Sequence, residues 1–459
     1  MSRVVIFFEI GIFLSVSLFM PSVVQAQTLE EALALSYQNN PGLKAEQAKL
    51  RAIDEQVSQA LSGWRPSIDA VGEVGKTYQK NSEDVVGVPS SANLSPRDVS
   101  ITVTQPIFRG FRTTSSVRSS EAAVLAQRAV LMDVEQKLLF DSAKTYLDVV
   151  LAQQVLGMNK ENERVLSQQL EATTDRFRVG ELKKTDVSQA ELRLSAAKAS
   201  RAVAEGDLSN KRSAFLRLIG EVPHALSFPQ MTYEIPNEME GALSLVEKNN
   251  PSILAANYGV DVADADISTA KGSLLPEVSL VANANRGWNQ NTTYPGKQDT
   301  ASIMARVTVP LYRAGADYSK TRAAYQAKTQ KRMELDDVRR KARDNGMTSW
   351  QDLMTARAAI AAHKVEVQAA EMALEGVKEE SKVGTRTTLD VLNAEQELLN
   401  AKINLARSEH DEAIAHLQVM SAIGSLTARN LRLPVTLYNP SENYDDVRNK
   451  WVGFGKASD

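Results

Sequence analysis

The sequence predicts a mainly α-helical fold that also contributes strands to a membrane β-barrel, built from two copies of one helix-strand-strand-helix-helix unit. Three observations support this fold class: a long internal repeat, two very long helical segments, and short segments in which apolar and polar residues alternate. The repeat is seen where Asn39-Asn40-Pro41 recurs as Asn249-Asn250-Pro251, at an offset of 210 residues (249 − 39). Solenoid repeats have periods of about 20–50 residues, so this offset indicates two copies of one large unit.

Later landmarks of the two copies agree at a slightly shorter offset. Val179-Gly180 corresponds to Val383-Gly384, and Gly220 to Gly424, at an offset of 204 residues (384 − 180). The difference between the offsets places a longer loop between the strands of the first copy. The resulting organisation is a first repeat over 27–220, an inter-repeat segment over 221–238, a second repeat over 239–424 and a C-terminal tail over 425–459.

The first 26 residues have the pattern of a secretory signal peptide, 1–26. Arg3 precedes an apolar run over 4–20, and Val24-Gln25-Ala26 supplies a small-residue cleavage pattern. A membrane anchor is the alternative, which is disfavoured because the run is short and polar residues follow it. We therefore expect an exported chain that begins near Gln27. The absence of Cys excludes a lipid attached to an N-terminal Cys.

The charge balance and the polar residues argue against two broad classes of function. With 53 basic and 56 acidic residues the net charge is −3, whereas a nucleic-acid binder usually carries a basic patch or excess. The four histidines have no metal-ligand spacing, and no nucleophile or carboxylate pair forms a catalytic constellation. We expect no catalytic residues, no cofactor, no metal and no nucleic-acid partner.

Each copy begins with a helix and ends with a long helix, a tight turn and another helix. Thr28 is suited to cap the first helix, Pro41 interrupts it near Asn40, and Gly180 ends the long helix. The expected helices span 28–63, 113–178, 185–218, 240–273, 315–382 and 387–422. At 1.5 Å per residue the long helices extend about 100 Å. Such helices need lateral support, which the two shorter helices of each copy provide if they stack end to end.

The shorter helices carry an apolar seam. Val187, Ala190, Leu194 and Ala197 are spaced by three, four and three residues, and Val391 begins the same pattern in the second copy. This spacing indicates coiled-coil packing in which small residues allow close approach. A plain amphipathic helix on a globular core is the alternative, which the scarcity of bulky aromatic residues disfavours.

Four segments switch from helical to alternating periodicity. The expected strands span 66–80, 98–107, 276–288 and 301–311, two in each copy. In the first of them Ile68, Ala70, Val74 and Tyr78 all occupy even positions. A half-buried sheet of a soluble protein shows the same alternation, but aromatic residues at both strand ends are typical of membrane barrels.

One chain has too few strands to close such a barrel. The smallest membrane-spanning barrels have eight strands, so four strands per chain require several copies. Two copies supply eight strands and three supply twelve, and the wide bore of a helical tube continuous with the barrel favours twelve or more. The loops 81–97 and 289–300 are polar and rich in Gly, Pro, Ser and Asn, which suits the outer surface.

The tip turns and the strand-to-helix corners carry a family resemblance. The segment Val383-Gly-Thr-Arg-Thr-Thr-Leu-Asp-Val-Leu-Asn-Ala394, its weaker copy at 179–190 and the corner Gln105-Pro-Ile-Phe-Arg-Gly110 resemble the TolC family of outer-membrane efflux and secretion channels. The resemblance covers essentially the whole mature chain. It implies a homotrimer with a 12-strand β-barrel in outer-membrane lipid, a 12-helix periplasmic α-barrel, and a mixed belt domain to which we assign 221–238 and 425–459.

The resemblance also implies a function and partners. It predicts a passive conduit, gated at its periplasmic tip, that works with a periplasmic adaptor and an inner-membrane transporter in efflux or type I protein secretion. The alternative is a periplasmic adaptor or structural coiled-coil protein, which would have one helical hairpin flanked by compact β domains. An envelope enzyme is disfavoured because nothing supplies its site.

The two tip turns, 179–186 and 383–390, are the expected functional sites. The residues expected to meet the adaptor are Val179, Gly180, Val383, Gly384 and Thr385. The resemblance places Asp390 at the pore entrance, where a symmetric ring of carboxylates favours cations. Asn393 takes the next inward position, where relatives commonly carry Asp, so we expect a less negative entrance. The alternative role of Asp390 is to cap a helix.

A contact between neighbouring hairpins is expected to hold the entrance shut. Arg386 lies close to the second tip and has Thr185 or Asp186 of the neighbouring hairpin as candidate partners. A single exposed ion pair contributes little, but several symmetric copies are enough to bias a two-state equilibrium. We therefore hypothesise that an Arg386–Asp186 contact gates the pore.

Overall fold

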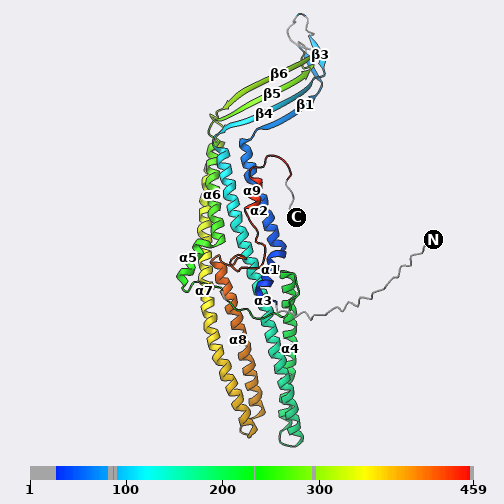
Figure 1. The fold of residues 1–459 in the computed structure, drawn as a ribbon, viewed down its shortest axis with the longest axis vertical. Helices are drawn as coiled ribbons and strands as arrows, with labels where there is room; N and C mark the ends of the chain where they lie inside the picture. The colour runs from blue at the N-terminus through cyan, green and yellow to red at the C-terminus, as the bar shows by residue number, and fades with distance from the viewer. Residues whose placement is uncertain (1–26, 81–85, 87–89, 232, 292–295, 455–459) are drawn as a thin grey trace, which may run out of the picture.

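The computed structural model describes residues 27–80, 86, 90–231, 233–291 and 296–454. The molecule is elongated, with a small sheet at one end and two helical hairpins that reach the other end (Figure 1). The predicted signal peptide, 1–26, and parts of the predicted loops 81–97 and 289–300 lie outside the described residues. Within the described part of the chain, no helix is both long and apolar enough to cross a membrane.

The helices of the first copy begin and end where local signals predict. They are α1 Leu29–Asn39, α2 Pro41–Leu61, α3 Arg112–Arg178 and α4 Lys184–Ile219. Thr28 caps α1, since its hydroxyl accepts from the Glu31 N–H (3.2 Å) and the Glu31 carboxylate accepts from the Thr28 N–H (3.1 Å). The predicted break falls at Asn40, whose side-chain oxygen accepts from the Gly42 N–H (2.9 Å) and begins α2.

The second copy repeats this order of helices. They are α5 Met239–Asn249, α6 Pro251–Gly272, α7 Ala316–Lys382 and α8 Thr388–Ala422. Asn250 separates α5 from α6 in the same way, and its amide also donates to the Ala422 carbonyl (3.0 Å). In Figure 1, α2 and α4 lie along α3, and α6 and α8 lie along α7. Each long helix is therefore supported by two shorter ones, as predicted.

Four strands form one antiparallel sheet in the order β1-β4-β5-β6. They are β1 Ser67–Val74, β4 Arg97–Arg109, β5 Glu277–Trp288 and β6 Lys297–Thr308. A separate two-stranded sheet consists of β2 Thr77–Lys80 and β3 Ser91–Leu94. As the edge strands, β1 and β6 each have one neighbour within the four-stranded sheet.

Two predicted strands differ from the structure in extent. The segment 66–80 is not one strand, because the chain leaves the ladder at Gly75, whose N–H donates to the Pro96 carbonyl (3.1 Å). The segment 301–311 is shifted, because β6 pairs with β5 along its whole length, from Trp288 opposite Lys297 to Glu277 opposite Thr308. Residues 297–300, which were predicted to lie in a loop, therefore belong to β6. A short helix in the tail, α9 Glu442–Val447, was not predicted.

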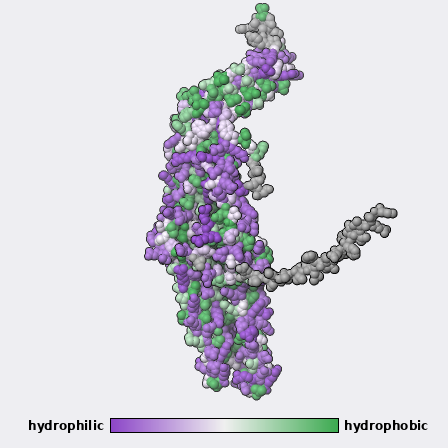
Figure 2. Space-filling view, in the orientation of Figure 1, coloured by the Kyte–Doolittle hydropathy of each residue, from purple (hydrophilic) through white to green (hydrophobic). Residues whose placement is uncertain are grey.

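The predicted alternation separates an apolar from a polar face of the sheet. One row across the four strands on the apolar face is Ile68, Val103, Ala282 and Ile303. The next row on that face is Ala70, Ile101, Ala284 and Ala301. A row on the opposite face is Asp69, Thr102, Asn283 and Ser302. Figure 2 shows apolar surface over the strands, so the sheet presents apolar side chains that the single chain does not cover.

The largest hydrophobic core lies in the middle of the molecule, where the two copies meet. Tyr146 of α3 and Phe215 of α4 are fully buried in it, and the Tyr146 hydroxyl lies 2.9 Å from the Ser227 carbonyl oxygen. Leu426 and Leu431 of the tail belong to the same core. The tail and the inter-repeat segment are therefore packed against the helices at one level of the molecule.

Candidate functional site

The two helical hairpins end in turns of the same geometry. Gly180 and Gly384 have φ of 81° and 82°, in the left-handed region that favours glycine. The Glu181 N–H donates to the Arg176 carbonyl (2.9 Å), and the Thr385 N–H donates to the Glu380 carbonyl (3.0 Å). These bonds satisfy carbonyls at the ends of α3 and α7. The two tips that the sequence predicts are therefore equivalent turns.

Apolar side chains stand in solvent at both tips. Val179 is 73% exposed and Val383 is 76% exposed, each directly before the turn glycine. Thr385 is exposed as well, and its hydroxyl donates to the Glu380 carbonyl (2.9 Å). Exposed apolar residues at a helical tip provide a surface for a partner. That an adaptor docks on these residues stays a prediction.

Asp390 caps the first turn of α8. Its carboxylate accepts from the backbone N–H of Thr387 (2.9 Å) and from the Thr387 hydroxyl (2.8 Å). In return the Asp390 N–H donates to the Thr387 hydroxyl (3.2 Å), which completes a capping box. The hydrogen bond from the Thr387 backbone holds the pKa of the Asp390 carboxyl below its ordinary value. Asp390 therefore stays charged at neutral pH, and its place at a pore entrance stays a prediction.

The hypothesised partners of the gate are engaged locally in the single chain. Arg386 pairs with Glu380 of its own hairpin, with Nε and Oε2 2.7 Å apart. The Asp186 carboxylate accepts from the Lys183 N–H (3.0 Å) at the start of α4. Thr185 is exposed. The described chain thus contains no Arg386–Asp186 contact, and such a contact between neighbouring chains stays a prediction.

A different pair joins the two hairpins near their tips. The Arg193 guanidinium of α4 donates to the Asn393 side-chain oxygen of α8 (2.7 Å). Behind this bond lies a small apolar cluster from α3, α4 and α8, which consists of Leu166, Leu194, Ala197 and Leu392. Sequence reasoning missed Arg193, because its partner lies 200 residues away and the seam pattern concerns only the apolar positions.

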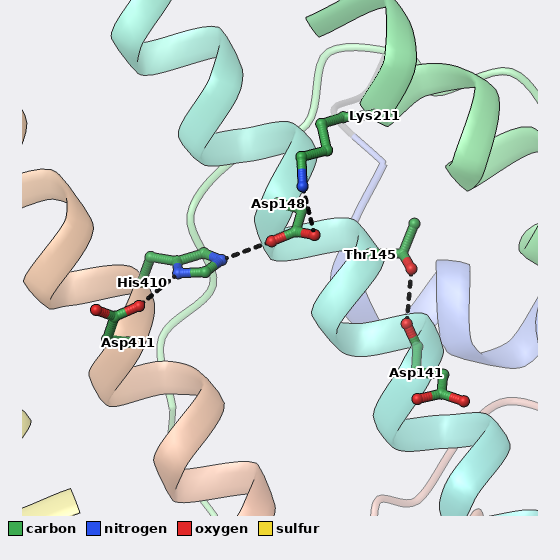
Figure 3. A network of polar contacts seen from close by, with 6 residues as sticks. All are labelled: Asp141, Thr145, Asp148, Lys211, His410 and Asp411. Carbon is green, nitrogen blue, oxygen red and sulfur yellow. Dashed lines mark hydrogen bonds and ion pairs between the residues drawn. The ribbon is translucent and has the colours of Figure 1, made fainter. Parts of the chain in front are cut away.

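Higher in the hairpins, a partly buried charged network joins three helices (Figure 3). His410 of α8 lies between two carboxylates, with its ring nitrogens 2.9 Å from Asp148 of α3 and 3.0 Å from Asp411. Lys211 of α4 donates to the second Asp148 oxygen (3.1 Å). Carboxylates at both ring nitrogens favour the doubly protonated imidazolium. The network therefore links the first and second copies of the repeat through charged side chains.

The pKa values of this network shift in opposite directions. Burial lowers the pKa of the His410 imidazole, but the hydrogen bonds to Asp148 and Asp411 outweigh burial and raise it above the ordinary value. Burial raises the pKa of the Asp148 carboxyl, but the hydrogen bonds from His410 and Lys211 outweigh burial and lower it below the ordinary value. Both shifts favour the charged pair.

The fold and these sites together define a class of protein. A sheet with one uncovered apolar face stands at one end of two long helical hairpins whose tips are exposed, which is the plan of a membrane channel subunit. Among the described residues, no group of three or more His, Cys, Asp or Glu side chains is arranged to hold a metal ion.

Comparison with known proteins names the family. A family model described as "Outer membrane efflux protein" matches residues 32–221 and 242–425, and the chain belongs to this family. The two matched segments are the two copies of the repeat. The protein is thus an outer-membrane channel protein, and the TolC-family resemblance is confirmed.

Individual relatives agree with this assignment over most of their length. The chain is 34% identical to the outer membrane efflux protein BepC of Brucella suis, over 94% of the chain and 92% of the relative. It is 26% identical to the outer membrane protein TolC of Escherichia coli, over 89% and 85%. The crystal structure of the Campylobacter jejuni CmeC outer membrane channel has the same fold, with a TM-score of 0.77 at 16% identity over 92% and 89% of the two chains.

Proposed function

We propose that three copies of this chain form a channel with a 12-strand β-barrel and a 12-helix α-barrel. The observation that carries the proposal is the four-stranded sheet, in which β1 and β6 are edge strands and one face is apolar. Unpaired strand edges are unfavourable in lipid, and pairing β1 with β6 of the next copy satisfies both. Three such sheets supply twelve strands around one axis.

The channel is a passive exit duct of a tripartite envelope system. The exposed tips with Val179 and Val383 face away from the sheet and are the surface for a periplasmic adaptor, which connects the duct to an inner-membrane transporter. The name of the Brucella relative supports efflux as the transport task. Protein secretion by a type I system is the second candidate that the family resemblance carries. The duct itself performs no chemistry.

Assembly is tested on outer-membrane fractions of cells that make the chain. We expect a band that migrates well above the monomer without heating and collapses to the monomer on boiling, together with conductance in planar bilayers. A periplasmic adaptor or structural coiled-coil protein would instead be recovered without heat-modifiable oligomers and without conductance, and that result would overturn the proposal. Comparing drug sensitivity and the secreted proteome of a deletion strain separates efflux from protein secretion.

A further inference from the structure

The chain after α9 is held against the helices just below the sheet. The Asn443 amide donates to the Asp54 carboxylate of α2 (2.9 Å), and Arg448 pairs with Glu121 of α3 (2.8 Å). From α9 the chain rises to a contact with Arg65 near the base of β1 and then bends away from the sheet (Figure 1). The position of the last described residues is thus set by contacts with two helices.

The contact at the base of the sheet involves Arg65, which lies two residues before β1. Its guanidinium donates to the Lys450 carbonyl (2.6 Å) and lies over the Trp451 ring, 5.0 Å from the ring centre. The Ser58 hydroxyl also donates to the Lys450 carbonyl (3.3 Å). The stacking on Arg65 therefore places Trp451 at the level where the strands begin.

Three large apolar side chains that follow Lys450 are exposed in the described chain. Trp451 is 67% exposed, Val452 is 86% exposed, and Phe454 is fully exposed. Other aromatic side chains are exposed at the same end of the sheet, where the strands meet the helices, namely Trp64, Phe111 and Tyr312. Aromatic residues gather in such a belt where a membrane protein crosses the lipid–water interface.

We propose that residues 450–454, the C-terminal hook, insert Trp451, Val452 and Phe454 into the periplasmic leaflet of the outer membrane. This inference rests on the proposed barrel. Trp is suited to the headgroup region, where its ring is half in lipid and its indole N–H remains hydrated. The neighbouring cations Arg65 and Lys450 favour lipids with anionic headgroups. The hook gives each chain a second attachment to lipid outside the strands.

The test uses the natural absence of Cys, which allows one labelled site per chain. Val452→Cys is coupled to a polarity-sensitive fluorophore in the full trimer, reconstituted in bilayers of phosphatidylethanolamine and phosphatidylglycerol. Val365→Cys on α7 is the control, because Val365 is exposed far from the sheet. We expect blue-shifted emission at 452 that shallow spin-labelled lipids quench several-fold more strongly than emission at 365.

Two outcomes would contradict the proposal that the hook inserts into lipid. Water-like emission at 452 would mean that the hook remains in the periplasm. Blue-shifted emission without lipid quenching would mean that a second copy of the chain covers it. Trimer bands and conductance are measured on the labelled sample and on the unlabelled wild type, and their absence in the wild type marks failure of the barrel proposal. Normal trimers with an unquenched probe mark failure of the hook alone.

Discussion

At the residue scale, His410 is the centre of a charged network that links the two copies of the repeat. The charged groups that face it are Asp148 from α3 and Asp411 from α8, and Lys211 from α4 reaches the far oxygen of Asp148. Since the imidazole is mostly buried, its charge depends on these partners. The network therefore makes the packing of α8 on α3 sensitive to the protonation state of His410.

We expect His410→Gln to destabilise the protein in acid more than in alkali. A histidine whose pKa is raised in the folded state adds to the free energy of unfolding. This contribution is fully present below the ordinary pKa of 6.5 and is lost as pH rises through the folded-state pKa. The lowered pKa of Asp148 acts oppositely, so its contribution is lost only as pH falls below 3.8. A charged hydrogen bond of this kind contributes about 1.5–3 kcal/mol.

Thermal unfolding followed by circular dichroism at pH 5 and pH 9 measures this difference. His363→Gln is the control, because His363 pairs with Glu366 on a single solvated helix. An equal loss of stability for His410→Gln at both pH values would show that the imidazole is held neutral and only packs.

Near the tips, the Arg193–Asn393 hydrogen bond links the two hairpins of the chain. We expect Arg193→Ala and Asn393→Ala channels to conduct more than the wild type in planar bilayers, because α4 and α8 separate more easily. One hydrogen bond contributes about 0.5–1.5 kcal/mol, and the three symmetric copies of the proposed trimer would multiply that effect. Arg201→Ala is the control, since Arg201 pairs with Glu163 within the first hairpin. An equal rise in conductance for the control would show that the Arg193–Asn393 bond does not limit conductance.

The hypothesised Arg386–Asp186 gate is measured in the same way. In the single chain, Arg386 pairs with Glu380 and Asp186 accepts from the Lys183 N–H. An Arg386–Asp186 contact between chains would therefore replace these local partners on assembly. We expect Arg386→Ala and Asp186→Ala to raise conductance if neighbouring chains exchange these partners. Unchanged conductance in both variants would end the gate hypothesis.

At the scale of elements, the turn glycines decide where the long helices stop. Val179 and Val383 end the helical conformation, and the next residue must adopt a positive φ for the chain to reverse. Added Cβ atoms at Gly180 and Gly384 meet nothing within 4 Å. The requirement for glycine is therefore one of backbone conformation rather than of space.

We expect Gly384→Ala and Gly376→Ala to change helix stability in opposite directions. The first places a Cβ at φ 82° and costs about 1 kcal/mol. The second lies inside α7, where replacing glycine favours the helix by about 1 kcal/mol. Neither Cβ has a contact within 4 Å in the chain. Hydrogen exchange of the last turn of α7 checks both, and weaker protection in Gly376→Ala would contradict the argument.

At the scale of the whole molecule, the two faces of the sheet require different surroundings. The apolar row through Ile303 needs lipid or a protein partner, whereas the row through Ser302 is polar and suits a water-filled lumen. The helical part below the sheet has hydrophobic cores of its own. We therefore expect the sheet to decide assembly in the membrane.

We expect Ile303→Lys to reduce heat-modifiable trimers in the outer membrane and Ser302→Lys to leave them nearly unchanged. A Lys on the lipid face near the bilayer midplane costs about 2–4 kcal/mol per chain, whereas a Lys in the lumen remains hydrated. The two positions are adjacent in β6, so both variants change the same strand and charge. Equal loss of trimers in the two variants would contradict the assignment of the faces.

Prediction from sequence succeeded where a residue acts through its own neighbours. Thr28, Pro41 and the tip glycines define helix ends by local hydrogen bonds and backbone conformation, and the observed ends lie within a residue or two of those expected. The split at Gly75 and the start of β6 at Lys297 were missed, because strand limits depend on the partner strand. Helix α9 was missed because contacts with α2 hold this short segment.

The sequence by itself determined the duplicated plan, the lengths of the helices and the alternating strands, because periodicity and turn residues act over a few residues of chain. Only the tertiary structure decided which distant side chains meet. Arg193 and Asn393 are 200 residues apart, and Asp148 and His410 are 262 apart, so no local pattern records either pair. The same holds for Trp451 on Arg65, because the path of the tail follows from packing on α2 and α3 rather than from its own six-residue helix.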